Sequence, residues 1–220
     1  WAHRRRGCLR AVRCSRRCSR FAADRLPVVP GRIGVLGANP LDLGDLSWAK
    51  TLLSRLPGAV CYGMDSGLEA VAAASSAEKN LVVAPSGLKA ARDLQARFGT
   101  PYACWDPLAE DLLPDLDFAG KRILVIHQQI TANTLREHLL ERGAETVHTA
   151  TWFMQLPELT RAGDTRLQEE DDLKDLVRAG GYDLILGDQA QWPILAGYAG
   201  ELADLPQFSV SGRMGATDHG

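Results

Sequence analysis

The residues best suited to chemistry in this sequence are polar side chains that directly follow short apolar runs. They are Asn39, Cys61, Ser86, Cys104 and His127. In an open parallel sheet, ligands bind beyond the carboxyl ends of the strands. If the apolar runs are parallel strands, these five residues are candidates for binding a cofactor. We predict no catalytic residue and no complete metal site among them.

The two cysteines in this set have two interpretations. A thiolate binds iron–sulfur centres, but such clusters ordinarily take four protein ligands, and Cys61 and Cys104 supply two. Cysteine is also a small residue that is often buried for packing alone. The whole chain has five cysteines, an odd number at uneven spacing, which argues against a disulfide framework.

His127 and Ser86 also have structural alternatives. His127 could bind a ligand or donate a proton, or it could simply be hydrogen-bonded at the edge of a sheet. Ser86 precedes a predicted helix, where its hydroxyl would cap the first turn. His138 and His148 form no spaced metal motif with His127.

Familiar nucleotide and hydrolase motifs are missing from the sequence. Gly34 and Gly37 give G-x-x-G without the first two glycines of the dinucleotide fingerprint. There is no Walker A run and no G-x-S-x-G elbow. Binding of a nucleotide phosphate and acyl transfer are therefore not expected.

The elements that would position the candidate residues alternate between strands and helices. The first series has strands at 32–37, 59–62, 80–84 and 101–104, and helices at 45–56, 67–77 and 87–98. A connector rich in Pro, Asp and Leu follows at 106–120. The second series has strands at 122–127, 145–149, 183–187 and 205–210, and helices at 130–142, 167–179 and 189–195.

Apolar strands separated by helices indicate parallel strands that are covered on both faces. We therefore predict an α/β fold of two consecutive doubly wound, Rossmann-like units with parallel sheets. The first unit is expected at 31–118 and the second at 119–220.

Residues 1–30 are set apart as an aberrant segment that we expect to be disordered. Its first 25 residues contain nine Arg and three Cys. Three explanations remain open: a basic arm for nucleic acid, a metal site of Cys8, Cys14, Cys18 and His3, or coding sequence read out of frame. We prefer the last, partly because the chain begins with Trp1, and do not expect a nucleic-acid partner.

Composition points to an ordinary globular protein. The chain has 220 residues, 45% of them hydrophobic, and a formal net charge of -2. No apolar run approaches the roughly 20 residues that cross a bilayer, and no secretory signal is evident. A cytoplasmic location without a membrane partner is expected.

The order of the motifs resembles nitrogenase component 1-like proteins. IGVLGANPLDLGD and NLVVAPSGLKAARDLQARFGTPY are similar to successive parts of one α/β domain of that family. RILVIHQQITANTLREHLLERGAETV, RLQEEDDLKDLV, YDLILGDQA and DLPQFSVSGRM resemble its last domain. Together they span about Arg32 to Met214.

The resemblance implies an oxidoreductase subunit that takes electrons from an ATP-dependent iron protein. It also implies an iron–sulfur cluster in the parent protein, held by cysteines of a preceding domain, and a homo- or hetero-oligomer with a related subunit. The chain would then be a fragment, inactive alone. Two alternatives are a cofactor- or tetrapyrrole-binding or assembly module without redox activity, and an α/β enzyme for a nucleotide-linked substrate.

Three departures from the family pattern argue against N2 reduction. Where true nitrogenase has a cofactor-binding Cys after a strand, this chain has Ala84 and Pro85. The late His of that cofactor has no counterpart near Phe208. The family's common Gly-Glu-Gln is replaced by residues 127–129, His-Gln-Gln.

Overall fold

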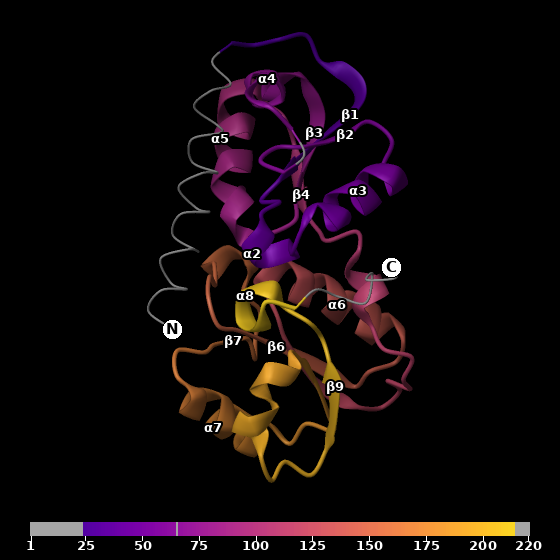
Figure 1. The fold of residues 1–220 in the computed structure, drawn as a ribbon, viewed down its shortest axis with the longest axis vertical. Coiled ribbons are helices and arrows are strands. Elements are labelled where there is room, and N and C mark those ends of the chain that lie inside the picture. The colour runs from indigo at the N-terminus through magenta and orange to yellow at the C-terminus, as the bar shows by residue number, and fades with distance from the viewer. Residues whose placement is uncertain (1–23, 65, 214–220) are drawn as a thin grey trace. The chain divides into compact units, whose positions relative to one another are not determined.

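The computed structural model describes residues 24–64 and 66–213, which form two compact units. The first unit ends at Pro107 and the second begins at Leu108 (Figure 1). Each contains one parallel sheet, so the predicted doubly wound α/β class is confirmed. The segment for which disorder was predicted lies mostly outside the described residues.

The first unit is built on a four-stranded sheet. Its strands are β1 (Val29–Leu36), β2 (Ala59–Cys61), β3 (Ala77–Val82) and β4 (Tyr102–Cys104). Its helices are α2 (Pro40–Leu43), α3 (Leu46–Arg55), α4 (Leu68–Ala72), η1 (Ala74–Ser76), η2 (Pro85–Gly87) and α5 (Leu88–Phe98). The strand order is β2-β1-β3-β4: β2 lies on one side of β1, and β3 and β4 lie on the other. The strand order therefore reverses between β1 and β3, which we call the reversal point of this sheet.

The second unit is built on a five-stranded sheet. Its strands are β5 (Arg122–Ile126), β6 (Thr146–Thr151), β7 (Thr165–Arg166), β8 (Leu184–Gly187) and β9 (Glu201–Asp204). Its helices are η3 (Ala109–Leu112), α6 (Gln129–Glu141), η4 (Pro157–Leu159), α7 (Glu170–Gly180), η5 (Gln189–Leu195) and α8 (Phe208–Ser211). The order is β7-β6-β5-β8-β9, and here the reversal falls between β5 and β8.

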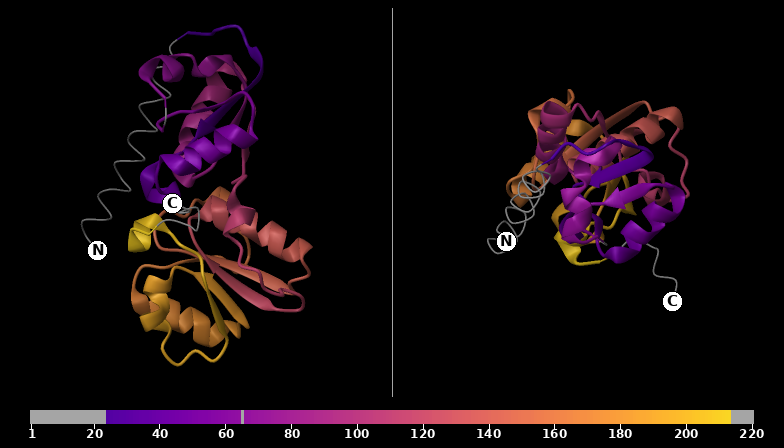
Figure 2. Two further views of the ribbon diagram at one scale, coloured as in Figure 1. Left: turned by 45° about the vertical axis from the view of Figure 1, so that its right-hand side comes forward. Right: turned by 90° about the horizontal axis from the view of Figure 1, so that it is seen from above.

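Alternating side chains of the second sheet form a core on each face. Ile123 and Val125 pack with Leu135 of α6 on one face. Leu124 and Ile126 pack on the other face, in a cluster that includes Leu173 of α7. Strands covered on both faces are typical of doubly wound folds, and Figure 2 shows helices on either side of each sheet.

Several predicted elements differ from the observed ones. The strand predicted at 205–210 is wrong, because these residues form a loop and the start of α8, and the last strand is β9. Two-residue β7 was missed. The helix predicted at 67–77 is shorter, because η1 interrupts it and β3 already begins at Ala77.

The connector at 108–118 folds with the second unit rather than the first. Ala109 and Phe118 are almost fully buried in the core that also contains Ile123. The unit boundary therefore lies about ten residues before the predicted one. Among the described residues, no helix is long and apolar enough to cross a membrane.

Candidate functional site

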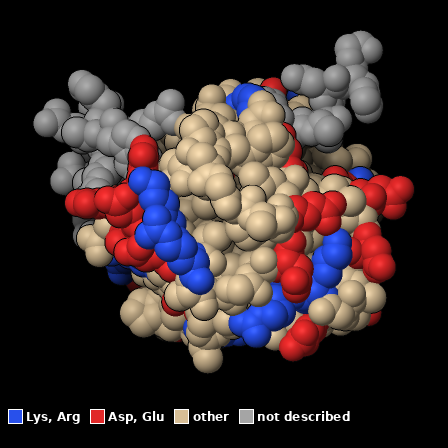
Figure 3. Space-filling model, turned by 90° about the horizontal axis from the view of Figure 1, so that it is seen from below, with Lys and Arg blue, Asp and Glu red and all other residues tan. Residues whose placement is uncertain are grey.

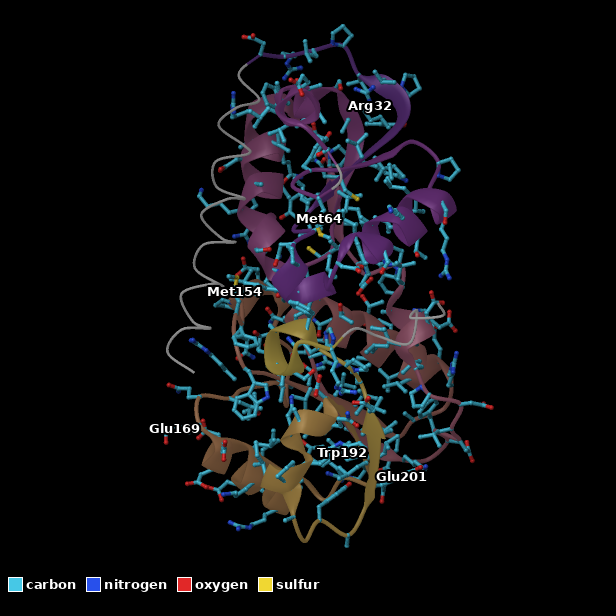
Figure 4. All side chains as sticks on the ribbon, in the orientation of Figure 1. Arg32, Met64, Met154, Glu169, Trp192 and Glu201 are labelled. Carbon is cyan, nitrogen blue, oxygen red and sulfur yellow. The ribbon has the colours of Figure 1, made fainter. Side chains whose placement is uncertain are left out.

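Asn39 and Ser86 meet at the reversal point of the first sheet, in the loops that follow β1 and β3. The amide nitrogen of Asn39 donates to the hydroxyl of Ser86 at 3.1 Å, and to the carboxylate of Asp42 at 2.6 Å. Its amide oxygen caps α2 by accepting from the backbone of Leu41 and Asp42. Figure 4 labels Arg32, at the amino side of this sheet, and Met64, beyond the carboxyl end of β2.

Ser86 does not cap α5, so that alternative is wrong. α5 begins after Gly87 and has no side-chain cap. The Ser86 hydroxyl instead faces Gly37, whose carbonyl oxygen accepts from it at 3.4 Å. Ser86 thus links two loops that follow neighbouring strands.

The reversal point of the first sheet is closed by backbone contact. A Cβ atom on Gly87 would lie 2.5 Å from the nitrogen of Gly37, and one on Gly37 would lie 2.6 Å from the oxygen of Ala84. Gly37 also has a φ of 88°, which favours glycine. Two glycines therefore allow the loops to touch and leave no space between them for a bulky group.

Asp42 is the titratable group of this loop pair. Burial raises the pKa of its carboxyl to about 6, although hydrogen bonds with Asn39 and Ser86 lower it. The side chains of Asn39, Asp42 and Ser86 satisfy one another. They hold the loops together and present few unused hydrogen-bonding atoms to a ligand.

The reversal point of the second sheet carries a polar row instead. The pairing of Ile126 with Ala150, and of Val125 with Leu186, places three residues level with one another: Thr151 at the end of β6, His127 directly after β5 and Asp188 directly after β8. Neighbouring strands are about 4.8 Å apart, so the three residues are direct neighbours. All three are buried.

His127 is a neutral imidazole with a defined tautomer. Burial lowers its pKa to about 4, against the opposing effects of a backbone hydrogen bond and the charge of Asp188. Its Nε2 lies 3.2 Å from the carbonyl oxygen of Pro206. A carbonyl can only accept, so Nε2 carries the proton and Nδ1 presents a lone pair.

Asp188 is a fully engaged carboxylate. Burial raises its pKa, but hydrogen bonds from the Gln207 backbone, Ser211, the Ala190 backbone and Arg213 outweigh burial, so the pKa is lowered. The four bonds measure between 2.5 and 3.1 Å and use both oxygens. Asp188 therefore fixes the loops after β8 and β9, and no lone pair remains for a metal or a proton transfer.

Arg213 is neutralised by two carboxylates. Its guanidinium donates to both oxygens of Asp204, at 2.8 and 2.9 Å, and to Asp188 at 3.1 Å. Because His127 is uncharged as well, the described residues at this edge of the sheet offer no unpaired positive charge. On the face drawn in Figure 3, basic side chains likewise lie among acidic ones.

Four buried residues at this edge have polar atoms without a hydrogen-bond partner among the described residues. These atoms are His127 Nδ1, Thr151 Oγ1 and both amide atoms of Gln191 and of Gln207. The four residues are between 1% and 4% exposed. Buried polar groups are nearly always hydrogen-bonded, so such a concentration at strand ends calls for an explanation.

We call Thr151, His127 and Gln207 the polar rim. Thr151 and His127 are neighbours in the sheet, and Gln207 directly follows Pro206, which accepts the His127 hydrogen bond. The backbone N–H of Gln207 donates to Asp188 at 2.9 Å, which fixes this loop against β8. Gln191 lies on the other face, where its amide oxygen would be 3.1 Å from a Cβ atom on Gly187.

Sequence reasoning found one of the three rim residues. His127 was predicted as a candidate because it follows β5. Thr151 was missed because β6 was predicted to end at 149, and Gln207 because its loop was predicted as a strand. The Pro206-Gln207 step was the available signal, since proline cannot donate within a sheet.

Comparison with known proteins supports a fold and not a sequence family. No protein-family model matches the chain, and no curated protein sequence matches it. A solved structure titled "Nitrogenase Cp1 at pH 6.5" matches with a TM-score of 0.61 and 12% identity. The match covers 94% of this chain and 60% of that one. The fold is nitrogenase-like.

A second structure is far less similar. The structure titled "X-ray crystal structure of a putative aspartate carbamoyltransferase from Trypanosoma cruzi" matches with a TM-score of 0.33 and 14% identity, over 92% of this chain and 80% of that one. A score this low carries no weight for fold or function. This chain spans 60% of the length of the nitrogenase structure.

The described residues do not fit the iron–sulfur cluster that a nitrogenase-like fold implies. Cys61 ends β2 and Cys104 ends β4, at opposite edges of the four-stranded sheet. Three strand spacings separate them, about 14 Å, which is too far for both to bind one cluster. Within the described ranges, no group of three or more His, Cys, Asp or Glu side chains could hold a metal ion.

Proposed function

We propose that this chain is part of a cytoplasmic oxidoreductase subunit of the nitrogenase component 1-like type, which receives electrons from an ATP-dependent iron protein. The observation that carries the proposal is the TM-score of 0.61 over 94% of the chain. The order of the sequence motifs from Arg32 to Met214 led to the same expectation, and the support from comparison with known proteins is structural alone. The iron–sulfur cluster and a related subunit belong to the parent assembly in this proposal.

The proposed substrate is not N2. After β3, where the resemblance implies a cofactor-binding Cys, the chain has Ala84, which is fully buried. The backbone of Ala84 packs against Gly37. The methyl group of Ala84 cannot bind a metal cofactor, and the loop contact leaves no room for one. This favours a subunit that reduces a molecule other than N2.

Within the chain, the edge of the second sheet is the region proposed to face the substrate. It has the polar rim and Asp188 at its reversal point, where doubly wound sheets bind ligands. The corresponding point of the first sheet is closed by Gly37 and Gly87. The two units would therefore contribute differently, with the second positioning the substrate.

The test is made on the native assembly. The chain is tagged in its host, the complex is purified without oxygen, and its iron and acid-labile sulfide are measured. The complex is then mixed with a reduced nitrogenase-type iron protein and MgATP, and oxidation of the iron protein is followed by its absorbance. We expect bound iron and an ATP-dependent oxidation that needs the tagged complex.

An iron-free complex that leaves the iron protein reduced would refute the proposal. That result would favour the alternative of a binding or assembly module without redox activity. A preparation from the same host with the chain deleted provides the background rate.

A further inference from the structure

We infer that the polar rim binds an uncharged, planar ligand with a lactam-like edge, that is, a ring N–H beside a carbonyl group. The inference rests on the proposed function, because it names the class of molecule that the subunit would hold for reduction. It is carried by three neighbouring residues whose buried polar atoms have no partner among the described residues.

The hydrogen-bonding pattern of the rim sets the ligand's groups. His127 presents the lone pair of Nδ1, because its Nε2 proton is engaged by the carbonyl of Pro206. A ligand N–H would complete that acceptor. The amide of Gln207 presents an NH2 donor that a ligand carbonyl would complete, and the hydroxyl of Thr151 can pair with either group.

The charges around the rim exclude the other ligand classes. An anion would need an unpaired cation, but Arg213 is held by Asp204 and Asp188. A metal ion would need unused carboxylate oxygens, but both oxygens of Asp188 accept two hydrogen bonds each. The rim itself is neutral, so an uncharged ligand avoids the cost of burying an unpaired charge.

Asp188 acts as a positioning residue for this site. Its carboxylate has no unused atom with which to bind the ligand. It accepts hydrogen bonds from the backbone N–H of Gln207 at 2.9 Å and from the hydroxyl of Ser211 at 2.5 Å, and so fixes both residues. Its backbone carbonyl also accepts from the N–H of Gln191 at 2.9 Å. The rim is therefore pre-organised by bonds that are complete without a ligand, which lowers the entropic cost of binding.

The test is a titration of the full-length chain, labelled with nitrogen-15, with 2-pyridone. The matched probe N-methyl-2-pyridone lacks only the N–H, and inorganic phosphate represents an anion. We expect 2-pyridone to shift the ring-nitrogen signals of His127 and the side-chain amide signal of Gln207. The N-methyl probe should bind at least about tenfold more weakly, since it cannot donate to Nδ1.

Two variants separate recognition from folding. Gln207→Met keeps the size of the side chain and removes both amide atoms, and Thr151→Val removes only the hydroxyl. Gln207→Met should weaken 2-pyridone binding at least about tenfold and raise the thermal midpoint, because it removes unpaired buried groups. Gln95→Met, at an exposed position of α5, is the control and should change neither.

The inference fails if neither pyridone binds, if both bind equally, or if phosphate competes with 2-pyridone. It also fails if Gln207→Met binds as the unaltered chain does or loses stability, because the amide would then be satisfied within the protein. Should Gln207→Met not fold, Thr151→Val decides: weaker binding of 2-pyridone than by the unaltered chain supports the inference, and unchanged binding overturns it. Since binding is measured without an electron donor, its failure leaves the iron-protein test of the proposed function untouched.

Discussion

At the scale of single residues, the second sheet places two titratable groups side by side and gives them opposite environments. Asp188 is held charged by four hydrogen bonds, whereas His127 is held neutral by burial and by a single bond to a carbonyl. The carboxylate has no unused lone pair and the imidazole has one. The two residues therefore do not act as an acid–base pair. Asp188 holds the surrounding loops in place, and His127 beside it has a free hydrogen-bond acceptor at Nδ1.

The first prediction concerns the pH dependence that His127 imposes on stability. Its pKa falls from 6.5 to about 4 on folding, so the unfolded chain binds a proton that the folded chain excludes. The stability that follows from this shifted pKa is fully present above pH 6.5 and is lost as the pH falls to about 4. The free energy of unfolding should fall by about 3 kcal/mol over that range. Urea unfolding at pH 7 and at pH 4.5 should show most of this loss, roughly 2 kcal/mol.

The matched variant for this prediction is His127→Gln, which cannot titrate in that range. The difference in free energy of unfolding between the unaltered chain and the variant should shrink or reverse on acidification. A constant difference at both pH values would contradict the neutral, buried imidazole. Nitrogen-15 spectra at pH 7 should also show that Nε2 of His127 is protonated and that Nδ1 is not.

At the scale of elements, α6 shows how one helix serves two surfaces. Its apolar residues, Ala132, Leu135 and Leu139, pack on the second sheet. Its polar residues hold the segment between β6 and β7: Gln129 bonds to Leu156 and Thr160, and Asn133 to Leu159. The same segment is held further along by Arg136, which pairs with Asp164.

Sequence periodicity predicted α6 because its apolar residues recur at helical spacing. It could not predict the polar contacts, because their partners are backbone groups of a segment without regular structure. Two-residue β7 was missed for a related reason, as it is too short for any pattern. The loop at 205–207 was predicted as a strand from its apolar residues, but the Gln207 backbone is captured by Asp188.

The second prediction tests the buried pair of Arg136 and Asp164, whose side chains are 4% and 1% exposed. Asp164→Ala should lower the free energy of unfolding by about 3–5 kcal/mol, because it leaves a buried guanidinium without its counter-charge. Hydrogen exchange should rise most in residues 152–164. The measurement is urea unfolding combined with exchange mass spectrometry.

Its control is Asp175→Ala, which breaks the exposed pair with Arg178 and should cost less than about 1 kcal/mol. The double variant Arg136→Met with Asp164→Leu should recover most of the lost stability, since no buried charge remains. Equal costs for Asp164→Ala and Asp175→Ala would show that the buried pair does not anchor this segment.

At the scale of the whole molecule, the chain repeats one topology. The order β2-β1-β3-β4 in the first unit corresponds to β6-β5-β8-β9 in the second, which adds β7 beside β6. The alternation of strands and helices made this class predictable, because right-handed crossovers leave few arrangements. The different use of the two reversal points was not predictable, because it depends on which loops touch and which polar atoms remain without partners.

The boundary between the units also depended on packing that sequence patterns do not reveal. The connector rich in Pro and Asp reads as a linker, yet Phe118 is only 2% exposed and lies in the core of the second unit. Aromatic residues bury the most area per side chain, so one such residue can attach a segment that has no strand and little helix. The same connector contributes Ala109 of η3.

The last prediction follows from this attachment. In the full-length chain, Phe118→Ala should cost about 3–5 kcal/mol and raise hydrogen exchange in β5, β6 and β8. Leu94→Ala, in the buried side of α5, is the matched truncation in the first unit and should raise exchange in β1 and β3 instead. If Phe118→Ala left exchange in the second sheet unchanged, the connector would be a linker after all, and the second unit would begin near residue 119.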